Sequence, residues 1–309
     1  MNVLPDGNLN TDDGNTDDRT NHNDNAQEEN VGRFHDQVVF ITGGARGQGR
    51  AHALAFAREG ADIALLDAVE GSSMTVRYDL PTSEDLQRTQ EEITALGRRC
   101  LAFEGDVRDT AHVQEAVRRT VDELGRLDVA VANAGVFALA PAVDTNDEVW
   151  DDVLDINLSG VFRTVRAAAG HMSANGGGSI VTIASMAGRM AFPNAVAYVS
   201  AKWGVIGMTK TFAAELGEQG VTVNAVCPTN VETPMLTDNP DAARLFTGQE
   251  DPSREEVEQG AAAFTEQGIP WVQPEDVTEA VLFLAGPGAR HITGEALTVS
   301  AGQIATNAA

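Results

Sequence analysis

The chain has 309 residues, of which 42% are hydrophobic and 22% charged, a composition typical of a globular protein with ample length to bury a core. Its 46 acidic and 21 basic side chains give a formal net charge of −25, which argues against a nucleic-acid partner because phosphates bind to basic surfaces. No stretch approaches the ~18 consecutive apolar residues of a membrane span, so we expect no membrane partner either.

The charge balance also indicates the solvent in which the protein works. Lys202 and Lys210 are the two lysines of the chain, whereas hyperthermophilic proteins are enriched in both lysine and glutamate. A large net charge destabilises the compact state through self-repulsion, and salt screens that repulsion. The sequence therefore predicts a halophilic protein of a high-salt cytoplasm, with an ordinary acidic protein as the alternative.

Other features bear on location and cofactors. The first residues lack the basic and apolar regions of a signal peptide, so we expect a cytoplasmic location. Cys100 and Cys227 each lie in an apolar run and are predicted to be buried free thiols. The six histidines are scattered without the spacing of metal ligands, so no metal site is predicted.

The expected elements follow one another in a regular order. Residues 1 to about 30 are rich in Asn and Asp and lack apolar periodicity, so a disordered acidic tail is predicted over residues 1–35. Short apolar runs, typical of strands buried on both faces, occur at 38–41, 62–66, 99–104, 127–132, 179–184, 221–227 and 296–299. Helices are predicted between them, at 51–58, 84–96, 110–124, 147–174, 198–218 and 274–285.

This alternation predicts right-handed βαβ units, and hence one domain over residues 36–309 with an α/β fold and a doubly wound, seven-stranded parallel sheet. Ligands of such Rossmann sheets bind at the carboxyl ends of the strands. Two connections are longer than the fold needs. They are an insertion at 68–82, before the second helix, and residues 229–272 after the sixth strand, where a substrate-binding loop belongs.

A glycine-rich turn, TGGARGQGR, joins the first strand to the first helix and contains Gly43, Gly47 and Gly49. These glycines permit a tight turn and let a pyrophosphate meet the helix N-terminus. Asp67, at the end of the second strand, would accept hydrogen bonds from an adenosine ribose and repel a 2′-phosphate, which favours NAD over NADP. Arg46 argues in the opposite direction, for NADP, because a guanidinium near that ribose would pair with a 2′-phosphate.

Three further segments end strands at the same edge of the predicted sheet. Asp106 is placed to accept a hydrogen bond from adenine, residues 133–135 would bring main chain close to the cofactor, and residues 228–233 would hold the nicotinamide carboxamide. The predicted contacts with NAD are Gly43, Arg46, Gly47, Gln48, Gly49, Asp67, Asp106, Val107, Asn133, Ala134, Gly135, Tyr198, Lys202, Val231 and Thr233.

Tyr198 and Lys202 are four residues apart in a helical segment and therefore lie on one face of the helix. There the lysine would lower the pKa of the tyrosine from about 10 towards neutral, which makes Tyr198 a candidate acid and base for a reaction at an oxygen. Ser185, just after a strand, would present its hydroxyl to the same place. By itself such a Tyr–Lys pair is more often an ordinary surface or packing pair.

The chain resembles the short-chain dehydrogenase/reductase family in motifs that fall in family order and spacing: the glycine turn, Asn-Ala-Gly at 133–135, Asn157, Ser185 and Tyr198-x-x-x-Lys202. The resemblance implies a catalytic tetrad in which Tyr198 is the acid and base. Lys202 lowers the pKa of Tyr198 and binds the nicotinamide ribose. Ser185 orients the substrate oxygen, and Asn157 holds a water in a proton relay. The resemblance also implies a homotetramer.

Four features narrow the resemblance to the carveol-dehydrogenase or mycofactocin-associated subgroup. They are the insertion, the sequence ARGQGR at 45–50, Pro228-Thr229 where many relatives have Pro-Gly, and the sequence IPW at 269–271 followed by QPED at 273–276. In that subgroup the insertion is thought to cover the NAD and hold it tightly, with electrons passing to a separate redox carrier. The resemblance thus implies that residues 68–82 cover the cofactor, and a surface excursion is the alternative.

Apolar residues of several loops are predicted to wall the substrate pocket: Met235, Leu236, Leu245, Phe246, Phe264, Trp271, Phe137, Met186 and Phe192. They favour a small apolar or cyclic secondary alcohol or ketone, oxidised or reduced with NAD. Two alternatives stay open: an NADPH-dependent biosynthetic ketone reductase, such as a 3-oxoacyl-carrier-protein reductase, and an NAD-sensing protein without activity. Asp67 and the acidic surface argue against the first, and the complete tetrad argues against the second.

Overall fold

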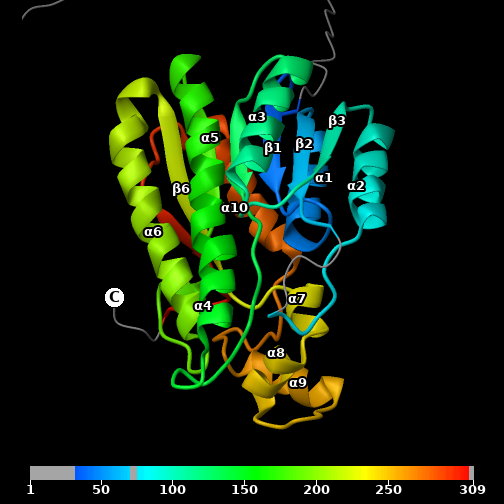
Figure 1. Cartoon of the computed structure of the whole chain (residues 1–309), viewed down its shortest axis with the longest axis vertical. Helices are drawn as coiled ribbons and strands as arrows, with labels where there is room; N and C mark the ends of the chain where they lie inside the picture. Colours follow the sequence, from blue (N-terminus) through cyan, green and yellow to red (C-terminus); the bar gives the residue numbers. More distant parts are fainter. Residues whose placement is uncertain (1–31, 70–74, 306–309) are drawn as a thin grey trace, which may run out of the picture. The chain divides into compact units, whose positions relative to one another are not determined.

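The computed structural model describes residues 32–69 and 75–305. Within them seven parallel strands form one sheet in the order β3-β2-β1-β4-β5-β6-β7, which confirms the predicted doubly wound fold (Figure 1). The strands are β1 Val38–Thr42, β2 Asp62–Asp67, β3 Cys100–Glu104, β4 Val129–Ala132, β5 Gly178–Ile183, β6 Val221–Pro228 and β7 Ala296–Val299. Because β1 pairs with β2 on one side and with β4 on the other, the strand order reverses there, which is where such sheets bind ligands.

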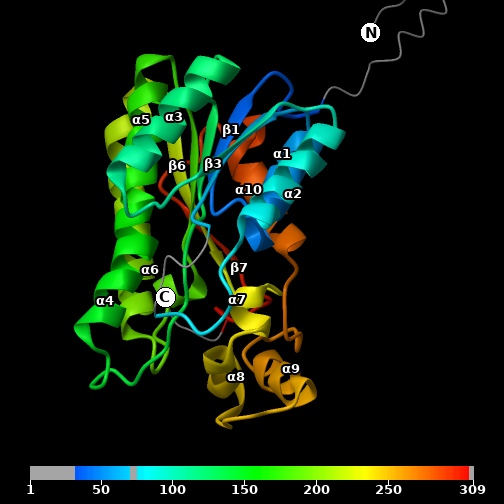
Figure 2. The same ribbon diagram turned by 45° about the vertical axis from the view of Figure 1, so that its right-hand side comes forward.

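Helices cover both faces of the sheet (Figures 1 and 2). One layer contains α1 Gly47–Arg58, α2 Ser83–Ala95 and α10 Pro274–Ala285. The opposite layer contains α3 Thr110–Leu124, α5 Val161–Ala174 and α6 Val196–Leu216. Between elements lie the 3-10 turns Met186–Gly188, Gly217–Gln219 and Pro287–Ala289.

The long helix predicted at 147–174 is confirmed, with a local change in its hydrogen bonding. It consists of α4 Asp147–Leu154, a π-helical stretch Asp155–Gly160, and α5. Stretches of π-helix inside α-helices are rare and occur frequently at functional sites. This one contains Asn157, a residue of the predicted tetrad.

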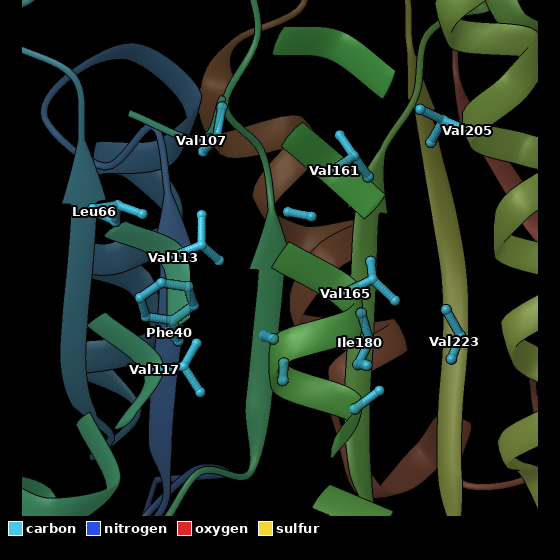
Figure 3. Packing of buried hydrophobic residues seen from close by; sticks show 14 of the residues in the cluster. Phe40, Leu66, Val107, Val113, Val117, Val161, Val165, Ile180, Val205 and Val223 are labelled. Atoms are coloured by element: carbon cyan, nitrogen blue, oxygen red, sulfur yellow. The ribbon is translucent and has the colours of Figure 1, made fainter. Parts of the chain in front are cut away.

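The alternation of side chains along the strands builds the two halves of the core. Phe40 of β1 packs beside Val113 and Val117 of α3, and in the same cluster Val165 of α5 lies by Ile180 of β5 (Figure 3). The next residue, Ile41, belongs to the cluster on the other face of the sheet, with Leu54 of α1. All of β1 is buried, so the turn that follows it starts from a rigid position.

The segment after β6, predicted as a substrate-binding loop, contains three short helices (Figures 1 and 2). These are α7 Pro234–Thr237, α8 Pro240–Thr247 and α9 Arg254–Ala262. Proline occupies the first helical position of α7 and of α8, where its missing N–H breaks no helical bond. The segment returns to its start through an isolated parallel bridge between Val231 and Val272.

The predicted tail extends to residue 35, but the ordered domain already includes residues 32–35. Phe34 is fully buried, and its N–H donates to the carbonyl of Glu59 at 3.0 Å. Arg33 forms an ion pair with the carboxylate of the same Glu59 at 2.8 Å. The rest of the predicted tail, and residues 70–74 of the insertion, lie outside the described residues.

Candidate active site

The glycine turn after β1 needs glycine at each of its three marked positions. Gly43 and Gly47 have φ angles of 70° and 56°, in the left-handed region that favours glycine. A Cβ atom on Gly49 would lie 1.9 Å from the carbonyl oxygen of Gly43. The chain therefore keeps an open cradle of main chain at the point where α1 begins, which suits a pyrophosphate.

Asp67 ties the end of β2 to this turn. Its carboxylate accepts a hydrogen bond from the N–H of Ala45 at 2.8 Å. Burial raises the pKa of Asp67 to about 6, although the bonds from Ala45 and Ala68 oppose that rise. The guanidinium of Arg46, a candidate partner for a 2′-phosphate, instead donates to the main-chain carbonyl of Asp79 in the insertion.

Two adjoining pockets form one groove along the carboxyl edge of the sheet. They share five lining residues: Gln48, Asn133, Gly135, Thr233 and Met235. The first pocket also brings together the predicted cofactor contacts Gly43, Arg46, Gly47, Asp67, Asp106, Val107 and Ala134. The second adds Asn157, Ser185, Tyr198, Lys202 and Val231. Gly49 lines neither pocket and serves the close packing of the turn.

Two of the predicted contacts have partners that the sequence did not indicate. The carboxylate of Asp106 forms an ion pair with Arg108 at 2.6 Å, so its acceptor capacity for adenine is partly taken. The side-chain amide of Asn133 donates to the carbonyls of Thr42 and Gly43, at 3.0 and 3.1 Å. Asn133 thus holds the glycine turn against the end of β4.

Ser185 and Tyr198 meet in the second pocket. Ser185 caps the 3-10 turn after β5, where its hydroxyl oxygen accepts the N–H of Ala187 at 3.1 Å. Tyr198 lies in the first turn of α6, and its side chain lines the same pocket as Ser185, whose hydroxyl acts to lower the pKa of Tyr198. The two hydroxyl groups are therefore placed to contact one substrate oxygen.

Burial dominates the pKa values of both Tyr198 and Lys202. Burial raises the pKa of Tyr198 to about 12, and the hydroxyl of Ser185 opposes this. The ammonium of Lys202 donates to the carbonyl of Ile183 at 2.9 Å and lies 5.5 Å from the centre of the tyrosine ring. Burial lowers the pKa of Lys202 to about 8. The sequence pattern placed the two residues together but could not indicate how deeply both are buried.

Asn157 is fully buried and makes three hydrogen bonds to main chain. Its side-chain N–H group donates to the carbonyls of Val136 and Val153 at 3.0 Å each, and its carbonyl oxygen accepts the N–H of Val136 at 3.2 Å. A Cβ atom on Gly135 would lie 2.7 Å from that oxygen. Asn157 thus fixes the loop after β4 against the π-helical stretch.

Tyr78, which the motif analysis did not single out, also lines the groove. It comes from the insertion and is one of two tyrosines in the chain. Its hydroxyl oxygen accepts the N–H of Phe137 at 3.2 Å. The rarity of tyrosine and the unusual length of the insertion were the signals available in the sequence.

The second pocket has the predicted apolar character. Its wall includes Phe137, Met186, Phe192, Met235, Leu236, Leu245 and Phe246. Phe264 and Trp271, which were predicted for the same wall, instead pack behind it, each with its ring centre 5.6 Å from that of Phe246. The prediction for these two residues was wrong because sequence proximity does not distinguish a lining side chain from one that supports it.

Other polar groups play structural parts. Both cysteines are free thiols, as predicted, and Cys227 is buried, but Cys100 is only half-buried, contrary to the prediction, because β3 lies at the edge of the sheet. His52 is buried in α1 against Thr278, and burial lowers its pKa to about 3. Among residues 32–69 and 75–305 no group of His, Cys, Asp or Glu side chains is placed to hold a metal ion. Within the same residues, every helix is too short or too polar to cross a membrane.

The fold and groove define a dinucleotide-binding oxidoreductase, and comparison with known proteins specifies the family. Residues 37–244 match the short chain dehydrogenase family, so the chain belongs to it. It is 41% identical to the (−)-trans-carveol dehydrogenase of Rhodococcus erythropolis, over 88% of this chain and 99% of that protein.

Solved structures give the same result. The carveol dehydrogenase of Mycobacterium avium in complex with NAD is 43% identical, with a TM-score of 0.86 over 89% of this chain and 100% of that one. A short-chain dehydrogenase of Mycobacterium paratuberculosis bound to NAD is 37% identical, with a TM-score of 0.81 over 88% and 99%. The resemblance to carveol dehydrogenases that the sequence motifs indicated is thus confirmed.

The residues of the groove fit NAD. The turn offers a cradle that a Cβ on Gly49 would fill, next to the unpaired N–H groups of α1. Asp67 provides a carboxylate at the end of β2, where a ribose diol binds in this fold. At the other end, Val231 and Thr233 line the pocket that contains Tyr198 and Lys202.

Proposed function

We propose that the protein is an NAD-dependent alcohol dehydrogenase that moves a hydride between NAD and a small apolar or cyclic secondary alcohol or ketone. One observation carries the proposal: Ser185 and Tyr198 line the same apolar pocket, which adjoins the pocket of the glycine turn and Asp67. The names of the relatives, which include carveol dehydrogenases and NAD complexes, support it.

Tyr198 is the acid and base of this mechanism. When bound, NAD supplies the hydride acceptor or donor. In oxidation, Ser185 holds the alcohol oxygen while Tyr198 accepts its proton, and in reduction Tyr198 returns a proton to the carbonyl oxygen. Lys202 is 3% exposed, so its ammonium lies in surroundings of low dielectric where it stabilises a phenolate strongly. Each charge then opposes the effect of burial on the pKa of the other.

Initial-rate measurements test the proposal. We expect cyclic secondary alcohols, with (−)-trans-carveol among them, to reduce NAD in the presence of the purified protein. The alternative, an NADPH-dependent biosynthetic ketone reductase, requires a preference for NADP(H) and activity on 3-oxoacyl thioesters. Asp67 speaks against it, because a buried carboxylate repels a 2′-phosphate. Activity with NADPH alone would exclude the proposed function.

We also propose that the insertion covers the cofactor. Within the described residues 75–82, Tyr78, Leu80 and Pro81 line the first pocket. The main-chain carbonyl of Asp79 accepts a hydrogen bond from Arg46 of the glycine turn, and Arg77 forms an ion pair with Asp241 of α8 at 2.9 Å. Retention of NAD(H) through extensive dialysis, and reoxidation by a separate redox carrier, would agree with this. Free exchange with added NAD would contradict it.

Two further properties belong to the proposal. The aromatic side chains of Phe162 on α5 and Trp203 on α6 are 39% and 53% exposed, and we expect a second copy of the chain to cover them in a homotetramer. Light scattering measures this directly. The charge of −25 supports a role in a high-salt cytoplasm.

A further inference from the structure

Two buried atoms on the wall of the groove have no hydrogen-bond partner among residues 32–69 and 75–305: Oε1 of Gln48 and Nδ2 of Asn230. Burying a polar atom without a partner is unfavourable, and folded proteins pair nearly all such atoms. One of the two atoms is an acceptor and the other a donor. Together they are complementary to a group that carries both functions.

Their positions in the groove limit which group this is. Gln48 lies in the first turn of α1 and lines both pockets. Asn230 follows β6 and lines the pocket that contains Tyr198. The next residue, Val231, pairs with Val272, and both valines are buried in the core. Val231 thus faces the core, whereas Asn230 faces the groove that it lines.

The other buried atoms of this kind do not belong to the groove wall. Nε2 of His52 lies inside the layer of α1 and α10, where the other ring nitrogen of His52 bonds Thr278. Nε1 of Trp271 lies behind Phe246. Neither residue lines either pocket. The acceptor and donor of the groove are therefore a distinct pair.

We propose that Gln48 and Asn230 recognise the carboxamide of the nicotinamide ring: Gln48 accepts a hydrogen bond from the amide N–H group, and Asn230 donates one to the amide oxygen. The inference rests on the proposed function, which brings the nicotinamide end of NAD to the pocket of Tyr198. The adenosine end belongs at Asp67 in the first pocket, so the residues shared by the two pockets lie along the path between them.

The hydrogen-bonding capacity of a carboxamide matches this arrangement. A primary amide has two N–H donors and an oxygen with two acceptor sites. The bridge between Val231 and Val272 uses the carbonyl of Asn230 and the N–H of Glu232, so the N–H and C=O of Val231 face the other way. The C=O of Val231 then accepts one N–H of the amide, and the N–H of Val231 donates to the amide oxygen. The side chain of Gln48 accepts the second N–H, and the side chain of Asn230 donates to the second acceptor site of the oxygen.

An amide held at both ends cannot rotate, which fixes the face that the nicotinamide ring presents to the substrate. Gln48 and Asn230 are thus residues that determine cofactor specificity and orientation, whereas Tyr198 handles the proton. If the two side chains have this role, the affinity for the dinucleotide depends on the carboxamide group. The Kd values of NAD analogues that differ from NAD only in this group can measure that dependence.

The first test uses Gln48→Leu, which keeps the size of the side chain and removes its acceptor. After co-purified nucleotide has been removed, calorimetry measures the Kd values of NAD and of 3-acetylpyridine adenine dinucleotide, which has a methyl group instead of the amide nitrogen. We expect the variant to bind NAD about tenfold more weakly, a typical effect for one hydrogen bond to a buried group. Binding of the acetylpyridine analogue should stay within about twofold, since it has no N–H to lose. Gln48→Glu, which keeps an acceptor oxygen, should retain the preference for NAD.

Asn230→Leu provides the complementary test. NAD and the acetylpyridine analogue both keep the carbonyl oxygen, so this variant should weaken the two by the same factor. ADP-ribose, which lacks nicotinamide, should bind equally to the unaltered protein and to every variant. If Gln48→Leu weakens both dinucleotides equally, changes neither, or also weakens ADP-ribose, the inference is wrong. If the unaltered protein binds neither NAD nor ADP-ribose, the proposed function itself fails.

Discussion

The hydroxyl oxygen of Tyr78 accepts the main-chain N–H of Phe137 at 3.2 Å, which joins the insertion after β2 to the loop after β4. The ring of Phe137 in turn packs edge-on against that of Tyr198, with 4.9 Å between ring centres and an angle of 81°. The insertion thus reaches Tyr198 through one intermediate residue. Burial raises the pKa of Tyr78 to about 12, so its hydroxyl stays neutral and available for this bond at physiological pH.

Tyr78→Phe should therefore destabilise the protein although it removes a single oxygen. The N–H of the buried Phe137 loses its acceptor, a loss of about 1–3 kcal/mol in the free energy of unfolding. For a domain of this size each kcal/mol lowers the Tm by about 2–4 °C. A matched control is Arg77→Gln, which breaks an ion pair of the same segment whose arginine is 64% exposed. Because exposed pairs contribute little, about 0–1 kcal/mol, the control should shift the Tm less. Equal shifts in thermal melts would contradict this account of Tyr78.

Tyr198→Phe should separate catalysis from cofactor binding. It keeps the ring that packs on Phe137 and removes the hydroxyl to which the proposed mechanism assigns the proton transfer. Loss of a positioned acid or base typically lowers the rate about 10²- to 10⁴-fold, and we expect kcat to fall by that much. The Kd of NAD, from calorimetry, should stay unchanged. Near-normal turnover by the variant would end the proposed mechanism.

The pH dependence of that turnover has a definite direction. Burial raises the pKa of Tyr198 to about 12, so the neutral phenol predominates at pH 7. Oxidation requires the deprotonated form and reduction the protonated form. The kcat/KM for alcohol oxidation should therefore rise with pH between 7 and 10, while that for ketone reduction stays level or falls. Opposite slopes in steady-state assays would contradict the role of Tyr198.

Asp67 should make NAD binding stronger as the pH rises. Its folded-state pKa of about 6 lies above its ordinary value of 3.8, because burial disfavours the charge. The ribose hydroxyl groups donate to the ionised carboxylate, so NAD favours the deprotonated form. Between pH 5 and pH 7 the Kd of NAD should fall by about tenfold, in proportion to the ionised fraction. Asp67→Asn should bind NAD more weakly and lose this dependence, and an unchanged slope in the variant would assign it to another group.

The same carboxylate affects stability with the opposite sign. Between its unfolded and folded pKa values the folded protein retains a proton that the unfolded chain has lost, so stability falls as the pH rises through that window. Asp67→Asn keeps an oxygen to accept the N–H of Ala45 but avoids the buried charge. In thermal melts at pH 7 without nucleotide, the variant should have the higher Tm. A lower Tm would contradict this account, because it would mean that ionisation of the carboxylate hardly destabilises the folded protein.

The features that could be predicted from the sequence are those encoded locally. The central strands read as apolar runs because β1, β2 and β4 are buried along almost their whole length, whereas the edge strands β3 and β7 are less buried than predicted. Gly43 and Gly47 mark the turn since their left-handed main chain favours glycine. Tyr198 and Lys202 come together because four residues span one turn of α6.

The remaining features depend on tertiary packing. The contact between Tyr78 and Phe137 follows from the path of the insertion, which has no periodic pattern. The pKa of Tyr198 is raised by burial, which its spacing from Lys202 does not reveal. In the same way, Phe34 was assigned to the tail because one apolar residue in a polar stretch gives no periodicity, yet it is fully buried.

The net charge of −25 should make stability depend on salt. Repulsion among the acidic side chains destabilises the compact state, and the Debye length falls from about 10 Å at 0.1 M salt to about 3 Å at 1 M. The Tm should therefore rise by several degrees over that range of KCl and change little above it, and activity should follow the same curve. Sucrose, which stabilises by exclusion from the protein surface without screening charge, is the control and should not reproduce the plateau. A Tm and activity that are the same at 0.1 M and 1 M KCl would contradict the prediction of a halophilic protein.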